Sequence, residues 1–211
     1  QPLLASGKAE RYFVLLSLFH EDMHCEALGY TRQTHGWPAP RFRAADPPAP
    51  EGGGPCPGDV HVPGGAFLLG SDREEGFVFD NEKWSHPVEV APFAIARAPV
   101  TQEAFRAFVE AGGYRRRDLW SGEGWRWREA AAAEHPVYWR RGAAGWERRH
   151  FDGWLPLEPH RPAIHVAWHE AQAFCRWLTR ETGVPHRLPA EAEWEVAARG
   201  GLAGEPFPWG R

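Results

Sequence analysis

A stretch rich in proline and glycine, from Arg43 to Gly58, divides this chain of 211 residues into two parts of different character. It contains the run Ala-Asp-Pro-Pro-Ala-Pro-Glu-Gly-Gly-Gly-Pro. Proline lacks the backbone N–H that helices and central strands use, and glycine loses much conformational entropy in either element. The stretch is therefore predicted to be a linker at residues 43–58, which joins one domain at residues 1–42 to another at residues 59–211.

The first part is predicted to form one long helix over residues 9–35, which ends near Gly36-Trp37-Pro38. His20 and His24 are four residues apart, so their imidazoles lie on one face of the helix, one turn apart. The same face carries four apolar residues: Phe13, Leu16, Met23 and Ala27. Imidazoles on a buried apolar face need a partner, and a shared divalent metal ion would be one. The alternative is two histidines that are solvated or have hydrogen-bond partners in a core.

Helix geometry also sorts the acidic residues beside this pair. At about 100° per residue, Glu26 points nearly opposite His24, so it is not expected to be a direct metal ligand. Glu21 completes the pattern H-E-x-x-H, in which zinc proteases use the glutamate as a general base. Its extended form needs a histidine at position 30, where the chain has Tyr30. A zinc hydrolase is therefore kept as an alternative only.

Composition limits the remaining function classes. A formal net charge of −4 gives no electrostatic reason to expect nucleic acid or an anionic membrane as a partner. No apolar run approaches the roughly 20 residues of a membrane span, and no signal peptide is visible. The three cysteines form no C-x-x-C motif, so reduced thiols and a cytoplasmic location are expected. Twelve tryptophans suit a loop-rich fold, and they offer aromatic faces to a cationic ligand.

The second part has short segments typical of a mixed α+β domain. Strands are predicted at Gly65–Gly70 and Val88–Ile95, and helices from Thr101 to about Ala111, over Glu170–Thr182, and opening near Leu188–Glu195. Residues 114–159 are rich in Trp and Arg and show little periodicity. One amphipathic helix cannot bury its own apolar face, so partner helices are expected upstream of Gln1.

Several motifs of the second part occur in the order found in the formylglycine-generating-enzyme-like domain. They are Val62–Ser71, Pro99-Val100-Thr101, His165-Val166-Ala167-Trp168 followed by Glu170-Ala171, Arg187–Glu195, and Pro208-Trp209-Gly210. The resemblance covers about residues 60–211 and implies a modified C-type-lectin-like fold. With the His20–His24 helix before it and Gly76–Lys83 within it, the chain resembles the sulfoxide synthases of ergothioneine biosynthesis. These join an iron-binding, DinB-like four-helix-bundle domain to the loop-rich lectin-like domain.

This resemblance implies a non-haem iron(II) enzyme that uses O2 to bond sulfur to hercynine at the imidazole carbon between the two ring nitrogens. Three histidines hold the iron; His20 and His24 match two of them, and the third is expected upstream. A tyrosine that donates a proton is expected beyond Arg211. Met23 replaces a glutamine found in several relatives, and Tyr30–Thr34 resembles the selenoneine synthase branch. That branch uses a selenosugar, whereas the sulfur branch uses cysteine or γ-glutamylcysteine.

The trimethylammonium group of hercynine would be recognised by aromatic faces and carboxylates. Asp80, Asn81 and Trp84 are predicted to contact this substrate; the alternative is that they form a structured surface loop. His165 and His169 are also four apart, but His165 precedes the predicted helix, so a second metal site is not expected. A non-catalytic lectin-like binding protein remains a further alternative, and the oligomeric state is left open.

Overall fold

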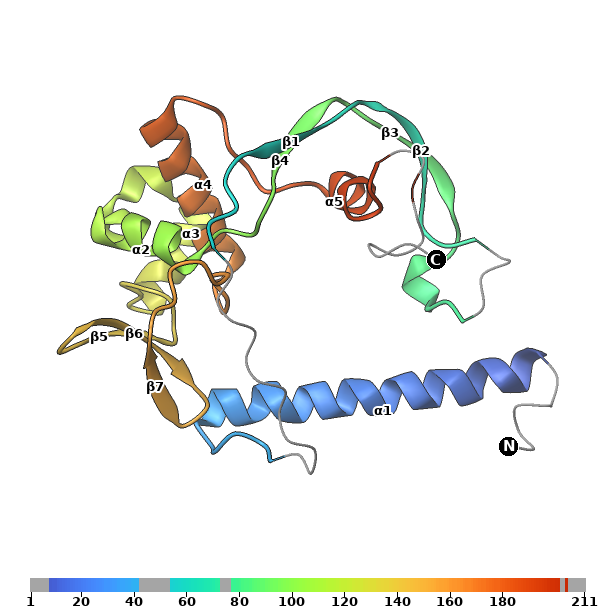
Figure 1. Cartoon of the computed structure of the whole chain (residues 1–211), viewed down its shortest axis with the longest axis horizontal. Coiled ribbons are helices and arrows are strands. Elements are labelled where there is room, and N and C mark those ends of the chain that lie inside the picture. The colour runs from blue at the N-terminus through green and yellow to red at the C-terminus, as the bar shows by residue number, and fades with distance from the viewer. Residues whose placement is uncertain (1–7, 42–53, 73–76, 202–203, 205–211) are drawn as a thin grey trace. The chain divides into compact units, whose positions relative to one another are not determined.

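A computed structural model describes residues 8–41, 54–72, 77–201 and 204 (Figure 1). The chain divides into two compact units, each of which combines segments from different places in the sequence. The first unit contains residues 1–40, 61–94 and 190–211, and the second contains residues 41–60 and 95–189. These units are defined by packing, whereas the predicted domains at 1–42 and 59–211 follow from the proline- and glycine-rich stretch between them and stay a prediction. Most of the predicted linker and the motif Pro208–Gly210 lie outside the described residues.

The first unit begins with the long helix α1, Lys8–His35, which confirms the helix predicted over residues 9–35 (Figure 1). It ends because Gly36 adopts a φ of 64°, a conformation that side chains with a Cβ disfavour. The Trp37 N–H then donates to the Arg32 carbonyl at 3.0 Å and closes the last turn. Of the helices in the described residues, none is long and apolar enough to cross a membrane.

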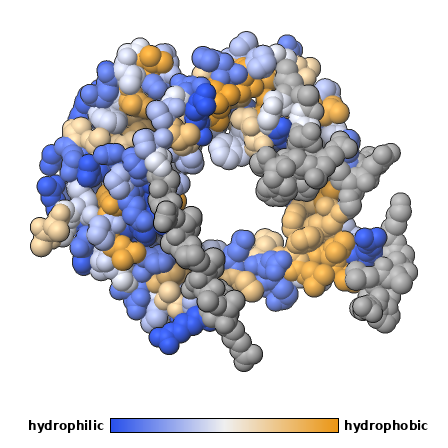
Figure 2. Space-filling model, in the orientation of Figure 1, coloured by the Kyte–Doolittle hydropathy of each residue, from blue (hydrophilic) through white to orange (hydrophobic). Residues whose placement is uncertain are grey.

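The apolar face of α1 is predicted to be buried, but in the described residues it is covered only in part, with Leu16 and Ala27 half-buried. Phe13 is 64% exposed and Met23 is 54% exposed. Figure 2 shows hydrophobic residues gathered at the surface over the N-terminal half of this helix. The physical reason is that the side chains that contact α1, Phe77 and Phe79, meet the face that carries Tyr12 and Phe19.

Two small antiparallel sheets follow α1 in the chain. Strand β2 (Gly65–Leu69) pairs with β3 (His86–Val90), and β1 (Asp59–Val62) pairs with β4 (Phe93–Ala96). The single strand predicted at Val88–Ile95 is therefore wrong: it is the end of β3 and the start of β4. The break comes at Pro92, which cannot donate a ladder hydrogen bond, and the two strands pair with different neighbours.

Helix α5, Glu191–Ala198, packs on the β2–β3 hairpin in the first unit. Its Val196 is fully buried. The Gly70 N–H donates to Glu195 Oε1 at 3.0 Å, and Arg199 donates to the Leu68 carbonyl at 2.9 Å. These two bonds tie the end of β2 to α5 even though about 125 positions separate the partners.

The second unit is built around an aromatic core. Its elements are α2 (Gln102–Glu110), η3 (Gly113–Arg115), η4 (Arg117–Leu119), α3 (Gly122–Ala130), β5 (Trp139–Gly142), β6 (Gly145–His150), β7 (Gly153–Pro156) and α4 (Trp168–Thr182). Phe105 and Phe108 of α2 pack on Phe174 of α4, with ring centroids 5.4 and 5.9 Å apart. Thr101 accepts a hydrogen bond from the Ala104 N–H at 3.2 Å, which confirms it as the cap of α2.

Residues 114–159, which show little periodicity, hold α3 and the three-stranded antiparallel sheet β5–β6–β7. Two turn signals mark this sheet in the sequence: the glycines Gly142 and Gly145, and the pair Asp152-Gly153. Its strands lack a clear apolar alternation because arginine side chains cover tryptophan rings. The Arg140 guanidinium lies 4.0 Å from the centroid of Trp154.

Candidate functional site

His20 and His24 lie side by side on α1, with ring centroids 4.5 Å apart and ring planes at 73°. Two imidazoles that bind one ion through nitrogens at about 2.1 Å, at roughly a right angle, have centroids about 4.5–5 Å apart. The spacing therefore fits a shared metal ion. Both side chains are exposed, and among the described residues no cluster of three or more His, Cys, Asp or Glu side chains forms. The prediction that His20 and His24 bind a metal ion stays a prediction, and such a site would need at least one further ligand.

Glu21 and Glu26 are both exposed on the same helix. Within the described ranges, neither joins the two histidines in a three-ligand group. The prediction that Glu26 is not a direct ligand rests on helix geometry and stays a prediction.

The three predicted substrate residues lie close together in the first unit. Asp80 and Asn81 belong to η2, Asp80–Glu82, and Trp84 follows two residues later. Asn81 and Trp84 line a cavity of about 680 Å³, and Asp80 does not. The cavity is lined by Leu69, Gly70, Ser71, Asn81, Glu82, Lys83, Trp84, His86, Glu191, Trp194, Glu195, Ala198 and Arg199. The contribution of α5 to this cavity has a signal in the sequence, since Glu191 and Glu195 are one helical turn apart.

Asp80 binds two groups instead. Its Oδ1 accepts a hydrogen bond from the Tyr12 hydroxyl at 3.1 Å and from Lys83 Nζ at 2.7 Å. The hydrogen bond from Lys83, followed by that from Tyr12, lowers the pKa of Asp80 below its ordinary value. Lys83 Nζ also lies 4.4 Å from the Tyr12 ring centroid and 5.5 Å from that of Trp84. These two rings therefore already face a cation that belongs to the chain itself.

The acidic residues at the start of α5 have structural partners. Glu193 accepts the N–H of Ala190 at 2.7 Å, as expected for an acid in the first turn of a helix. Glu195 accepts from Gly70 at 3.0 Å and pairs with Arg199 at 3.2 Å. These contacts give Glu193 and Glu195 structural roles at the start of α5 and at its junction with β2.

The second histidine pair does not share a helical face. His165 lies before α4 with a φ of 60°, and His169 is the second residue of the helix. Burial, and then the charge of Arg149, lower the pKa of His165. His169 packs against Trp127 and Trp168. In the described part of the chain, His165 and His169 join no group of three or more possible metal ligands. The prediction that they form no second metal site stays a prediction.

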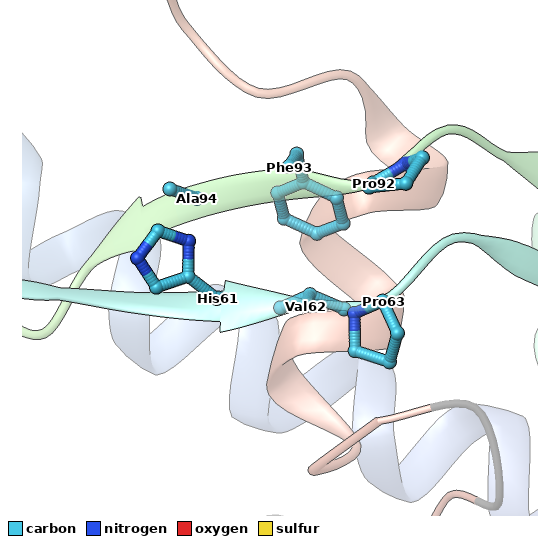
Figure 3. A pocket seen from close by; sticks show the side chains of 6 residues that line it. All are labelled: His61, Val62, Pro63, Pro92, Phe93 and Ala94. Atoms are coloured by element: carbon cyan, nitrogen blue, oxygen red, sulfur yellow. The ribbon is translucent and has the colours of Figure 1, made fainter.

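A smaller cavity of about 440 Å³ lies along the β1–β4 pair. Figure 3 shows the rings of His61 and Phe93 between the two strands. Its lining is His61, Val62, Pro63, Pro92, Phe93 and Ala94. This lining holds one imidazole and no acidic side chain, so it does not offer an acid–base pair.

Comparisons with known proteins identify the family. The family of the Sulfatase-modifying factor enzyme 1-like domain matches residues 44–211. A hercynine oxygenase of Mycolicibacterium thermoresistibile is 37% identical over 152 residues, which cover 68% of this chain and 31% of that protein.

Two further relatives carry other names. The inactive C-alpha-formylglycine-generating enzyme 2 of Mus musculus is 37% identical over 171 residues, covering 73% of this chain and 51% of that protein. A formylglycine-generating enzyme of Streptomyces coelicolor is 36% identical over 164 residues, covering 72% of this chain and 50% of that protein. The chain thus spans between about a third and a half of these relatives. By its sequence, it belongs to the family of Sulfatase-modifying factor enzyme 1-like domains.

Proposed function

We propose that this chain is part of an iron(II)- and O2-dependent oxidoreductase that forms a carbon–selenium bond, or a carbon–sulfur bond, at hercynine. The observation that carries the proposal is the His20–His24 pair, with rings 4.5 Å apart, on the helix that precedes the family domain. The likeness to hercynine oxygenases supports hercynine as the substrate. The bond would form at the carbon between the two ring nitrogens.

His20 and His24 would hold the iron, with a third histidine from the chain upstream of this segment. Bound there, iron(II) would supply activation of O2 and would acidify a selenol or thiol donor. Neutral imidazoles suit iron(II), and three protein ligands leave positions for small molecules. Joining the ring carbon to the chalcogen removes one hydrogen from each. These two protons and two electrons would reduce O2 to hydrogen peroxide, or, if the chalcogen also takes up one oxygen atom, the other oxygen atom would leave as water.

Substrate binding is proposed for the cavity that η2, the residues after it and α5 line. A trimethylammonium group cannot donate a conventional N–H hydrogen bond, so it is held by aromatic faces and carboxylates. Trp84 and Trp194 line the same cavity as Glu82 and Glu191, so the cavity offers aromatic faces and carboxylates to such a cation, although Lys83 and Arg199 line it as well. Asn81 adds an amide that can bind the polar end of the substrate. The role of these residues is to place the ring carbon beside the chalcogen donor.

A selenosugar is proposed as the donor, on the basis of Met23 and Tyr30–Thr34. The alternative within the family is cysteine or γ-glutamylcysteine. The test supplies the iron-loaded full-length protein with hercynine and O2, with each donor in a parallel reaction, and follows products by mass. Preference for the selenosugar supports the proposal, whereas preference for a thiol moves the protein to the sulfur branch. If hercynine is consumed with none of the donors, the proposed function is wrong.

Metal analysis separates the rival classes. The proposal expects about one iron per chain in protein purified without added metal. Zinc in its place, together with loss of hydrolysis on Glu21→Gln, would favour the H-E-x-x-H hydrolase. Absence of any metal would favour a non-catalytic binding protein.

A further inference from the structure

A short segment, residues 77–84, lies against the N-terminal half of α1. Its Phe77 ring stacks on Tyr12 with centroids 5.1 Å apart and lies 4.9 Å from Phe19. Phe79 lies 5.9 Å from Phe19 and 4.9 Å from Phe77. Aromatic pairs at these distances attract one another beyond the area that they bury. The four rings therefore form one cluster between the helix and the segment.

Polar contacts join the same two elements beside the aromatic cluster. The Tyr12 hydroxyl donates to Asp80 at 3.1 Å, and Lys83 Nζ donates to the same oxygen at 2.7 Å. Lys83 Nζ also donates to the Tyr12 hydroxyl at 3.4 Å and lies over its ring. The Lys83 side chain is only 21% exposed, whereas that of Asp80 is 87% exposed. Lys83 is thus held between Asp80 and Tyr12.

The position of these contacts on α1 relates them to the histidine pair. Tyr12 and Phe19 are seven residues apart, so they point to the same side of the helix within about 20°. His20 directly follows Phe19 and points about 80° away from Tyr12, onto the neighbouring face. Residues 77–84 contact α1 through Asp80 and Lys83, and the same segment contributes Asn81 and Trp84 to the lining of the cavity. A shift of the segment along the helix would therefore move cavity and histidines relative to each other.

We propose that Tyr12, Asp80 and Lys83 form a positioning lock that fixes α1, and with it His20 and His24, against the loop that carries Asn81 and Trp84. The lock itself is inferred from the contacts alone. Its effect on catalysis rests on the proposed function. It assigns Asp80 to positioning rather than to substrate contact. The three lock residues are positioning residues and take no part in bond formation.

The test compares Tyr12→Phe, Asp80→Asn and the double variant with Asp72→Asn in the full-length protein. Asp72 is a matched control because its carboxylate also accepts a side-chain hydroxyl, from Ser85 at 2.7 Å, without contacting α1. The backbone amides of Glu82 and Lys83 donate to the carbonyls of Phe79 and Asp80. Their hydrogen-exchange rates measure how firmly the segment is held, and this measurement does not depend on enzyme activity. We expect exchange there to rise about five-fold in each lock variant. The control should stay at the parent rate.

Turnover of hercynine is then measured with the iron content of each variant. We expect kcat to fall about three- to ten-fold in Tyr12→Phe and Asp80→Asn, at parent iron content, because misplacement slows the chemical step. The double variant should be slowed by less than the product of the two single effects. Both changes act on the Tyr12–Asp80 bond, since Tyr12→Phe removes its donor and Asp80→Asn removes the charge of its acceptor. Unchanged exchange in Asp80→Asn, or effects that multiply in the double variant, would overturn the lock. Raised exchange with unchanged kcat would overturn its positioning role. An inactive parent protein would reject the proposed function instead, while exchange still decides the lock.

Discussion

The hydroxyl of Tyr114 donates a hydrogen bond to the carboxylate of Glu170, a residue 56 positions later in the chain. Both side chains are buried. The other oxygen of Glu170 accepts the N–H of Ala167 at 2.6 Å, at the start of α4. One carboxylate therefore caps α4 and binds it to η3, inside the aromatic core of the second unit.

Removing the Tyr114 hydroxyl should destabilise the protein. Tyr114→Phe leaves a buried carboxylate oxygen without its donor, and such a loss costs about 1–3 kcal/mol. Denaturant unfolding measures the change in the free energy of unfolding. Tyr30→Phe is the control, because it removes a hydroxyl from a tyrosine that is exposed. Equal effects of the two substitutions would contradict a structural role for the Tyr114–Glu170 bond.

Glu170 should make stability depend on pH in the direction opposite to that of most carboxylates. Burial raises the pKa of Glu170, although its hydrogen bonds with Tyr114 and Ala167 act against this shift. A carboxyl group with a raised folded pKa contributes its full stability below its ordinary pKa. That contribution is lost as pH rises through the raised value. The stability of the parent relative to Glu170→Gln should therefore decline from about pH 4 toward neutral pH.

The contribution of Asp80 to stability should change with pH in the direction opposite to that of Glu170. Its hydrogen bond with Lys83, and then that with Tyr12, lower the pKa of Asp80. Its contribution is present above the ordinary pKa and is lost as pH falls through the lowered value. Urea unfolding of the parent, Glu170→Gln and Asp80→Asn at several pH values measures how each contribution to the free energy of unfolding changes with pH. A parent-minus-Glu170→Gln difference that grows with pH would show that burial does not dominate at Glu170.

Metal binding should depend on the histidine pair and not on the neighbouring acids. His20→Ala and His24→Ala should each remove most of the bound iron, because each deletes one of few ligands. Glu26→Gln should retain iron, and Glu21→Gln should retain turnover. Elemental analysis of the purified variants gives the iron content. Loss of iron in Glu26→Gln as complete as in the histidine variants would show that Glu26 is a ligand.

Gly113 should tolerate no side chain, because it packs on the ring of Phe108. A Cβ at position 113 would lie 2.1 Å from Phe108 Cε2, and Phe108 is fully buried in the core. Gly113→Ala should therefore destabilise the protein by about 1–3 kcal/mol through overpacking. Gly153→Ala is the matched control, since the added Cβ would lie 3.6 Å from its nearest neighbour, the His150 carbonyl oxygen. Thermal unfolding that shifts equally in both variants would contradict this packing argument.

Local signals predicted several elements well. Thr101 and Gly183 mark the ends of α2 and α4 because caps depend on residues next to them in sequence. The sequence predicts that α4 begins at Glu170, whereas in the structure it begins at Trp168. Glu170 is the third residue of the helix, and its carboxylate accepts the N–H of the cap residue Ala167. The β5–β6–β7 sheet was missed because contacts between its arginines and tryptophans replace the usual apolar alternation.

Local spacing along the chain is enough to predict that His20 and His24 share a helix face, because helical geometry is a property of the local backbone. It also determined the family of the second part, since its motifs occur in order along the chain. The contact of Asp80 with Tyr12, which lies 68 positions earlier, is seen only in the folded chain. No local pattern encodes such a contact, because side-chain partners across that distance are chosen by how the segments pack.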